Sequence, residues 1–116
     1  MSDKTLEMTM LYDFFGDLLT EKQRTYFDLY YNEDLSLAEI AEQAGISRQG
    51  VRDIIIRAEH ILLEYENKTG IVSRFLSLQE DIALLERDIN KIISVSEGDV
   101  KELAERTLIR VQNLKG

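Results

Sequence analysis

The sequence predicts an all-α protein in which a helix-turn-helix domain is followed by a C-terminal helical bundle extension. Three observations support this prediction. The 116 residues include no proline and only six glycines, so long helices are possible almost everywhere. Apolar residues recur at steps of three and four along most of the chain, which is the spacing of one helix face. Residues 35–58 have the pattern of two short helices joined by a tight turn.

Composition narrows the classes of function. The absence of cysteine excludes disulfides, thiol catalysis and cysteine-ligated zinc, and the single histidine, His60, excludes a histidine-pair metal site. We therefore expect a non-catalytic protein without metal or cofactor. The polar start Ser2-Asp3-Lys4 is not followed by the apolar core of a signal peptide, and no run reaches the ~20 apolar residues of a membrane span. The expected location is the cytoplasm, without a membrane partner.

The first two helices are expected to support the motif. Residues 5–19 form the first helix, and Thr20 with Gln23 makes a capping box that begins the second. The apolar face of the first helix comprises Met8, Leu11, Tyr12, Phe15, Leu18 and Leu19. The second helix carries Tyr26, Phe27, Leu29, Tyr30 and Tyr31. Aromatic residues at this spacing are more typical of a supporting core than of a surface that stacks on bases.

The first helix of the motif begins at a second capping box, formed by Ser36 and Glu39. Its inner face consists of Leu37, Ile40, Ala41 and Ala44. Gly45 can adopt the left-handed conformation that ends a helix, and Ile46 is expected to be the apolar plug of the turn. Small residues at Ala41 and Gly45 and branched Val51 fit the crossing of a helix-turn-helix, with an ordinary αα-hairpin as the alternative.

The second helix of the motif begins after the cap residue Ser47 and extends to about residue 68, before a stop at Gly70. Its buried stripe is expected to comprise Val51, Ile54, Ile55, Ala58, Leu62 and Tyr65. The residues expected to project outward are Ser47, Arg48, Gln49, Arg52, Asp53, Ile56 and Arg57.

These outward residues predict a surface that reads DNA. Arginine can bind guanine and glutamine can bind adenine through paired hydrogen bonds, and a serine at a helix start suits a phosphate. We assign Gln49 and Arg52 to base edges, Arg48 and Arg57 to phosphates, and Ser47 to the cap and a phosphate. The arginines could exchange these roles, and a solvated charged face is the alternative. Gly50 weakens the helix, and Asp53 would repel phosphates unless it binds cytosine or pairs with Arg52 or Arg57.

The C-terminal segment, residues 70–116, is expected to serve packing or dimerisation, whereas residues 1–69 form the helix-turn-helix domain. A heptad pattern comprises Phe75, Leu78, Ile82, Leu85, Ile89 and Ile92. Further apolar residues outside the pattern make this face too broad for a two-stranded coil. We expect the helix to be buried in a bundle, against the last helix and the long helix of the motif, with a bundle across two subunits as an alternative. Lys101, Arg106 and Arg110 of the last helix would then offset its acids.

Net charge and charge distribution point in different directions. The net charge of −8 disfavours a polyanionic partner. Residues 35–58 are neutral, however, because three acids are balanced by Arg48, Arg52 and Arg57, all on the second helix of the motif. An acidic protein with a locally basic helix can still bind DNA, although weakly per subunit.

Three stretches resemble region 4 of bacterial sigma factors: L-L-T-E-K-Q-R at residues 18–24, D-L-S-L-A-E-I-A-E at 34–42 and G-I-S-R-Q-G-V at 45–51. With M-T-M-L-Y-D-F-F-G-D-L-L-T at residues 8–20 included, the chain more closely resembles the YlxM family of small bacterial proteins. This resemblance implies a cytoplasmic DNA-binding regulator whose helix-turn-helix is similar to sigma region 4 and lacks a wing. It also implies a link to the signal recognition particle pathway.

Two hypotheses follow. The first is a homodimeric regulator of transcription that binds double-stranded DNA, with its two reading helices about 34 Å apart. The second is a protein- or RNA-interaction module, whose acidic body binds a basic component of the signal recognition particle.

Overall fold

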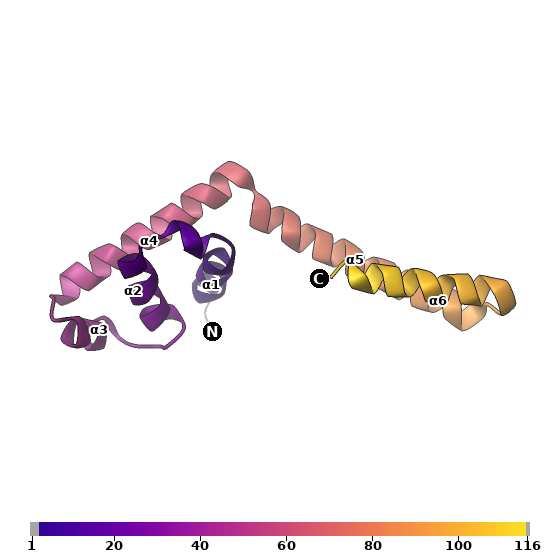
Figure 1. The fold of residues 1–116 in the computed structure, drawn as a ribbon, viewed down its shortest axis with the longest axis horizontal. Coiled ribbons are helices and arrows are strands. Elements are labelled where there is room, and N and C mark those ends of the chain that lie inside the picture. Colours follow the sequence, from indigo (N-terminus) through magenta and orange to yellow (C-terminus); the bar gives the residue numbers. More distant parts are fainter. Residues whose placement is uncertain (1–2, 116) are drawn as a thin grey trace. The chain divides into compact units, whose positions relative to one another are not determined.

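The computed structural model describes residues 3–115, and these form six α-helices and one short 3-10 helix without a β-strand (Figure 1). The elements are α1 (Asp3–Phe15), η1 (Gly16–Leu18), α2 (Glu21–Tyr31), α3 (Leu37–Ala44), α4 (Arg48–Thr69), α5 (Ile71–Val95) and α6 (Gly98–Asn113). The prediction of an all-α fold is thus confirmed. No helix in this described part of the chain is long and apolar enough to cross a membrane.

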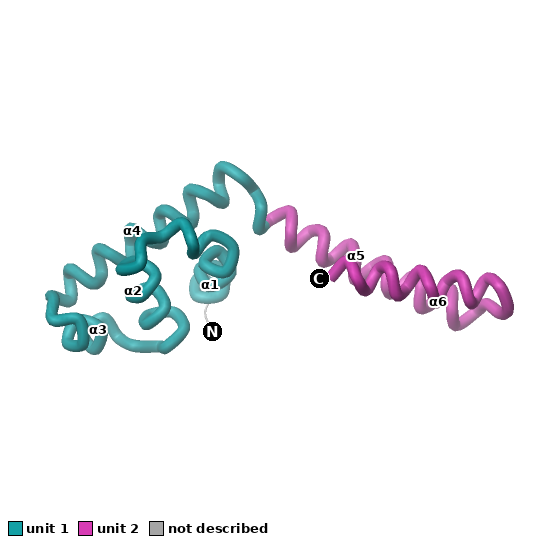
Figure 2. Tube along the Cα trace, in the orientation of Figure 1, with its two compact units in different colours: residues 1–72 teal, residues 73–116 magenta. Residues whose placement is uncertain are grey.

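The chain divides into two compact units, residues 1–72 and residues 73–116 (Figure 2). The first unit contains α1 to α4, and the second contains most of α5 together with α6. Each unit has its own cluster of buried apolar side chains.

Both predicted capping boxes are present. The Gln23 backbone N–H donates to Thr20 Oγ1 over 3.1 Å, and the Thr20 N–H donates to Gln23 Oε1 over 3.0 Å. Ser36 and Glu39 make the same reciprocal pair at 3.1 and 3.0 Å. The hydrogen bonds with Ser36 lower the pKa of Glu39 below its ordinary value. Each box satisfies two groups that a helix start otherwise leaves unpaired, and so fixes where α2 and α3 begin.

The core of the first unit forms around α4, which contacts α1, α2 and α3. Phe27 is fully buried, stacks on Tyr12 with ring centres 4.8 Å apart, and contacts Tyr31 with ring centres 4.5 Å apart. This confirms the expectation of a supporting core for Phe27 and Tyr31 of α2, against which the half-buried Tyr26 packs. The other buried apolar residues are Met8, Leu11, Phe15, Leu19, Ile40, Ala41, Val51, Ile55, Ala58, Leu62 and Val72.

Four expected core residues of this unit are exposed, among them Tyr30 near the end of α2. The first helix ends at Phe15 and tightens into η1, where the Leu19 N–H donates to the Gly16 carbonyl, so Leu18 turns outward and is 53% exposed. Ala44 is exposed at the last position of α3, and Tyr65 is 40% exposed near the end of α4. Ile54, also expected in the stripe, is half-buried. These residues lie at helix ends or at the edge of a stripe, where neighbouring helices cover them incompletely.

The second unit is a pair of antiparallel helices whose core consists of Ile82, Ile89, Ala104 and Val111, with Ile93 and Leu108 packed against it. The expectation that the whole heptad pattern is buried is wrong for this unit. Phe75, Leu78, Leu85 and Ile92 are 39–54% exposed, because α6 covers only one stripe of α5.

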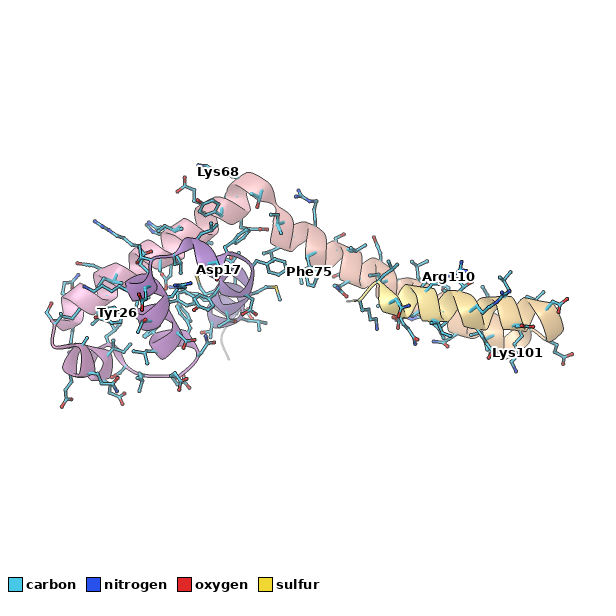
Figure 3. All side chains as sticks on the ribbon, viewed as in Figure 1. Asp17, Tyr26, Lys68, Phe75, Lys101 and Arg110 are labelled. Atoms are coloured by element: carbon cyan, nitrogen blue, oxygen red, sulfur yellow. The ribbon has the colours of Figure 1, made fainter. Side chains whose placement is uncertain are left out.

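Charge pairing in this unit also differs from expectation. The ion pair joins Lys115 Nζ to Glu86 Oε1 at 2.8 Å. Lys101, Arg106 and Arg110 form no ion pair with α5 among the described residues; Figure 3 labels Lys101 and Arg110 on α6.

Candidate nucleic-acid interface

The turn between α3 and α4 has the geometry that the sequence predicts. Gly45 ends α3 in the left-handed conformation, with φ of 70°, and its N–H donates to the Ala41 carbonyl over 2.9 Å. An L-residue with a side chain is strained in this conformation, whereas glycine is not. The connection then needs only residues 45–47 before α4 begins. Ala41 and Val51, the small and branched residues expected at the crossing, are 6% and 0% exposed.

Ser47 begins α4 as predicted, since its Oγ accepts a hydrogen bond from the Gly50 N–H over 2.9 Å. Ile46 was expected to be the buried apolar residue of the turn, but its side chain is 37% exposed. Its Cδ1 lies 3.6 Å from the position that a Cβ on Gly50 would occupy, and Ser47 Oγ lies 3.2 Å from the same position. Ile46 and Ser47 thus cover the backbone at Gly50, so a side chain at this position would be crowded by both residues. This crowding is a structural reason for glycine at position 50.

All five predicted binding residues, Ser47, Arg48, Gln49, Arg52 and Arg57, are exposed on the first half of α4 or at its cap. Helical spacing separates them into two rows, because residues four apart lie on the same side of a helix. Arg48 and Arg52 make one row. Gln49, Asp53 and Arg57 make the other, which lies about 100° further around the helix axis. Arg48 and Arg52 therefore lie one turn apart on the same side of α4, Gln49 contacts Asp53, and Arg57 lies one turn beyond Asp53.

Asp53 accepts a hydrogen bond from Gln49 and forms no ion pair with an arginine among the described residues. Gln49 Nε2 donates to Asp53 Oδ1 over 2.8 Å, and no ion pair joins Asp53 to Arg52 or Arg57 in residues 3–115. Of the alternatives left open for Asp53, pairing with an arginine is therefore not adopted: the Gln49 amide reaches the carboxylate across one helical turn, whereas the exposed arginine side chains do not contact it. Asp53 thus holds one of the two residues that we assign to base edges.

The three arginines of α4 form no ion pair or hydrogen bond with another side chain of the described chain. Their guanidinium groups are therefore available to an anionic partner. The start of α4 adds to this, because the free backbone N–H groups at a helix N-terminus carry partial positive charge. The first turn of α4 contains no acidic residue.

A shallow depression on α4 includes Asp53 and Arg57 of the second row. Its other lining residues are Ile54, Ile56 and His60. Ile56 was expected to project outward and is instead half-buried, whereas His60 is exposed. Among the described residues no group of three or more histidine, aspartate or glutamate side chains is placed to hold a metal ion.

Two features of α4 were not predicted from the sequence. The Gln49–Asp53 bond had a readable signal, since an amide and a carboxylate four residues apart on a helix often pair. Glu59 is buried, 9% exposed, and accepts a hydrogen bond from Tyr31 of α2. Its position next to Ala58 placed it at the edge of the predicted stripe, but nothing in the sequence identified Tyr31 as its partner.

Comparison with known proteins agrees with this geometry. A family model described as "Putative helix-turn-helix protein, YlxM / p13 like" matches residues 2–106. A UPF0122 protein of Halalkalibacterium halodurans is 48% identical over 91 residues, which is 78% of this chain and 84% of that protein. UPF0122 proteins of Bacillus thuringiensis and Bacillus anthracis are each 45% identical over 105 residues, 90% of this chain and 94% of each relative.

Proposed function

This chain belongs to the YlxM/p13-like family of helix-turn-helix proteins, and we propose that it is a transcriptional regulator that binds duplex DNA with the first three turns of α4. The observation that carries this proposal is the exposed start of α4. It combines a tight left-handed turn at Gly45, a capped N-terminus at Ser47 and arginines that pair with no side chain among residues 3–115. That arrangement suits a helix that enters the major groove by its N-terminal end.

The proposed contacts follow the two rows. Arg52 and Gln49 bind base edges in the major groove, where paired hydrogen bonds to guanine and adenine are available. Arg48 and Arg57 bind phosphates on either side, and Ser47 with the adjacent backbone N–H groups binds a third phosphate. The 2.8 Å hydrogen bond to Asp53 uses one of the two N–H groups of the Gln49 amide, so it limits the orientations in which the other N–H and the oxygen can reach adenine. The regulator is non-catalytic, acts in the cytoplasm and functions as a homodimer, because helix-turn-helix proteins usually bind two half-sites.

An alternative function is that of a non-catalytic module that modulates protein or RNA components of the signal recognition particle. The net charge of −8 favours this alternative, because it attracts a basic partner. The clustering of Arg48, Arg52 and Arg57 on one exposed helix end favours DNA.

Selection of bound sequences from random duplex DNA, followed by affinity measurement over a salt series, tests the proposal. A DNA-binding regulator should enrich a defined sequence and lose affinity steeply as salt rises. A pull-down with signal recognition particle components from the same cells, in parallel, tests the alternative. If no sequence is enriched, and duplex DNA at low salt is bound no better than by an unrelated protein of equal negative charge, the regulator proposal is wrong.

A further inference from the structure

The second unit exposes a row of large apolar side chains on each of its helices. On α5 the row consists of Leu78, Leu85 and Ile92, which are seven residues apart and 54%, 48% and 45% exposed. On α6 and its C-cap it consists of Val100, Leu103 and Leu114, which are 57–63% exposed. Within the described part of this unit nothing covers either row, although single exposed apolar residues would need no explanation.

Both rows lie on the same face of the helix pair. Leu85 and Ile92 follow the buried residues Ile82 and Ile89 by three positions, so the α5 row is turned about 60° from the line of contact with α6. On α6, Leu114 follows buried Val111 by three positions, which turns that row in the same sense. Two antiparallel helices that are turned in the same sense from their contact line present these rows to one side. The pair is therefore a two-helix layer with one apolar face.

The size of this face fits a partner of similar size. The six side chains expose roughly 600 Å², at the upper end of the largest apolar patch on a typical monomer and most of the ~800 Å² that each partner buries in a standard interface. A layer of two helices reaches the packing of a four-helix bundle when a second such layer covers it. The occupant that supplies an equal apolar layer is a second copy of this chain.

Charge at the borders of the face specifies how two copies would pack. Asp81 and Asp88 follow Leu78 and Leu85 by three positions, so acids border the face along the outer edge of α5. Arg106 follows Leu103 by three positions, and Arg110 precedes Leu114 by four, so bases border it along the outer edge of α6. Neither arginine has an ion-pair partner among the described residues. Arg74 precedes Leu78 by four positions and Asp99 precedes Leu103 by four, so the outer end of each edge carries one residue of the opposite charge. Between these ends the face is acidic along one edge and basic along the other.

We propose that this face binds the same face of a second copy to form an antiparallel four-helix bundle, with the two-fold axis running along the helices. This axis places α5 of one copy over α6 of the other. Residues equally far from the α5–α6 connection lie level, so Asp88 comes within one residue of the level of Arg106, and Asp81 within two residues of the level of Arg110, of the other copy. An axis across the helices would instead place α5 over α5 and bring the acidic edges together, which repels. The proposal deepens the dimer of the proposed function but depends on no DNA contact.

Sedimentation of the full chain without DNA tests the face. The wild type should sediment at about twice its 13.4 kDa mass at tens of micromolar. Leu103→Glu and Leu85→Glu should each raise the dimer Kd at least tenfold, with the helical circular dichroism retained. Ile109→Glu is the matched control, since Ile109 is 58% exposed against 57% for Leu103 but lies on the opposite side of α6. A wild type that sediments as a single chain, or a control that weakens the dimer as much as Leu103→Glu, overturns the proposal.

A charge exchange tests the axis and does not require a core substitution. Asp88→Arg should weaken the dimer several-fold, and adding Arg106→Asp in the same chain should restore it. If both single variants leave the dimer unchanged, or the double variant is weaker than either, the helices do not pair as proposed. Failure of DNA binding with an intact dimer would contradict the proposed function and leave this inference standing, so the two are distinguishable.

Discussion

The Tyr31 hydroxyl donates a hydrogen bond to the buried carboxylate of Glu59 and thereby joins α2 to the middle of α4. Lys4 Nζ of α1 lies 3.8 Å from the other oxygen of the same carboxylate, so three helices meet at one buried charge. Such a charge is tolerated in a core only when it has partners. The bond therefore fixes the helix that carries the reading surface.

Replacing Tyr31 should destabilise the first unit. Tyr31→Phe keeps the ring packing but leaves a buried carboxylate oxygen without its donor, which should lower the free energy of unfolding by about 1–3 kcal/mol. Glu59→Gln should cost less, because the amide oxygen can still accept from Tyr31. Urea denaturation measures both. Tyr30→Phe is the control, since the Tyr30 hydroxyl has no hydrogen bond in the described chain and should be near neutral; an equal loss there would contradict the role given to the bond.

Stability should fall in alkaline solution partly through Tyr31. Burial first, and then the hydrogen bond and charge of Glu59, raise the pKa of Tyr31 above its ordinary value of 10.0. The folded chain thus holds this proton more tightly than the unfolded chain, so the stabilisation is complete below pH 10 and is lost as pH rises above it. Urea unfolding at pH 9 and pH 11 should show a smaller decrease for Tyr31→Phe than for the wild type. An identical decrease in both would contradict the prediction.

Ser47 and Gly50 should be energetically coupled. Ser47→Ala removes the cap and should cost about 1 kcal/mol of stability. Gly50→Ala would gain up to ~1 kcal/mol of helix propensity, but its Cβ would lie 3.2 Å from Ser47 Oγ, a tight contact. We therefore expect Gly50→Ala to stabilise the Ser47→Ala variant more than the wild type. A double-mutant cycle by thermal or urea unfolding gives the coupling directly, and additive effects would rule it out.

Arg52 and Arg57 should contribute to DNA binding in different ways. Arg52→Ala should relax sequence preference and cost about 1–3 kcal/mol on the preferred site. Arg57→Ala should weaken binding to all sequences and reduce the salt slope by about 1. Arg87→Ala on α5 removes the same charge from an exposed site outside the first unit and is the control. Fluorescence anisotropy on selected and scrambled duplexes separates the two roles. If Arg57→Ala relaxes sequence preference and Arg52→Ala weakens binding to all sequences, the two assignments are reversed.

Removing Asp53 should tighten DNA binding. Asp53→Ala deletes a carboxylate from the row that we propose faces DNA and frees Gln49 from its 2.8 Å bond. We expect affinity for duplex DNA to rise several-fold at low salt, with a change in preference at the base that Gln49 contacts. Asp13→Ala, which removes an equal charge from exposed α1, should have little effect. Weaker binding by Asp53→Ala would mean that the carboxylate itself binds a base, such as the amino group of cytosine.

Local signals made much of this fold predictable. Thr20, Ser36 and Ser47 act through hydrogen bonds within four residues, and Gly45 through its own backbone, so their roles are legible in the sequence. The exposure of individual apolar side chains along a helical stripe was less predictable, because it depends on how much of the stripe a neighbouring helix covers. Leu85 and Leu18 satisfy the helical spacing but lie where no described neighbour in their unit covers them.

The candidate site was predictable in composition but not in its internal bonds. The positions of Arg48, Arg52 and Arg57 follow from the start and period of α4 alone. The Gln49–Asp53 hydrogen bond depends on which rotamers the side chains adopt, and an Asp53–Arg57 pair, also four residues apart, had equal support from spacing. Likewise, the partner of Glu59 comes from a helix 28 residues away in sequence, beyond the range of any local pattern.

One helix, α4, carries core residues on one side and the proposed reading residues on the other. Val51, Ile55 and Leu62 hold it in the fold, while Gln49 and Arg57 have no part in the core. Selection could therefore exchange the outward residues one at a time without loss of folding. Relatives that share this scaffold would be free to diverge in the targets they recognise, and a few substitutions on the outer rows would suffice to retarget the protein by design.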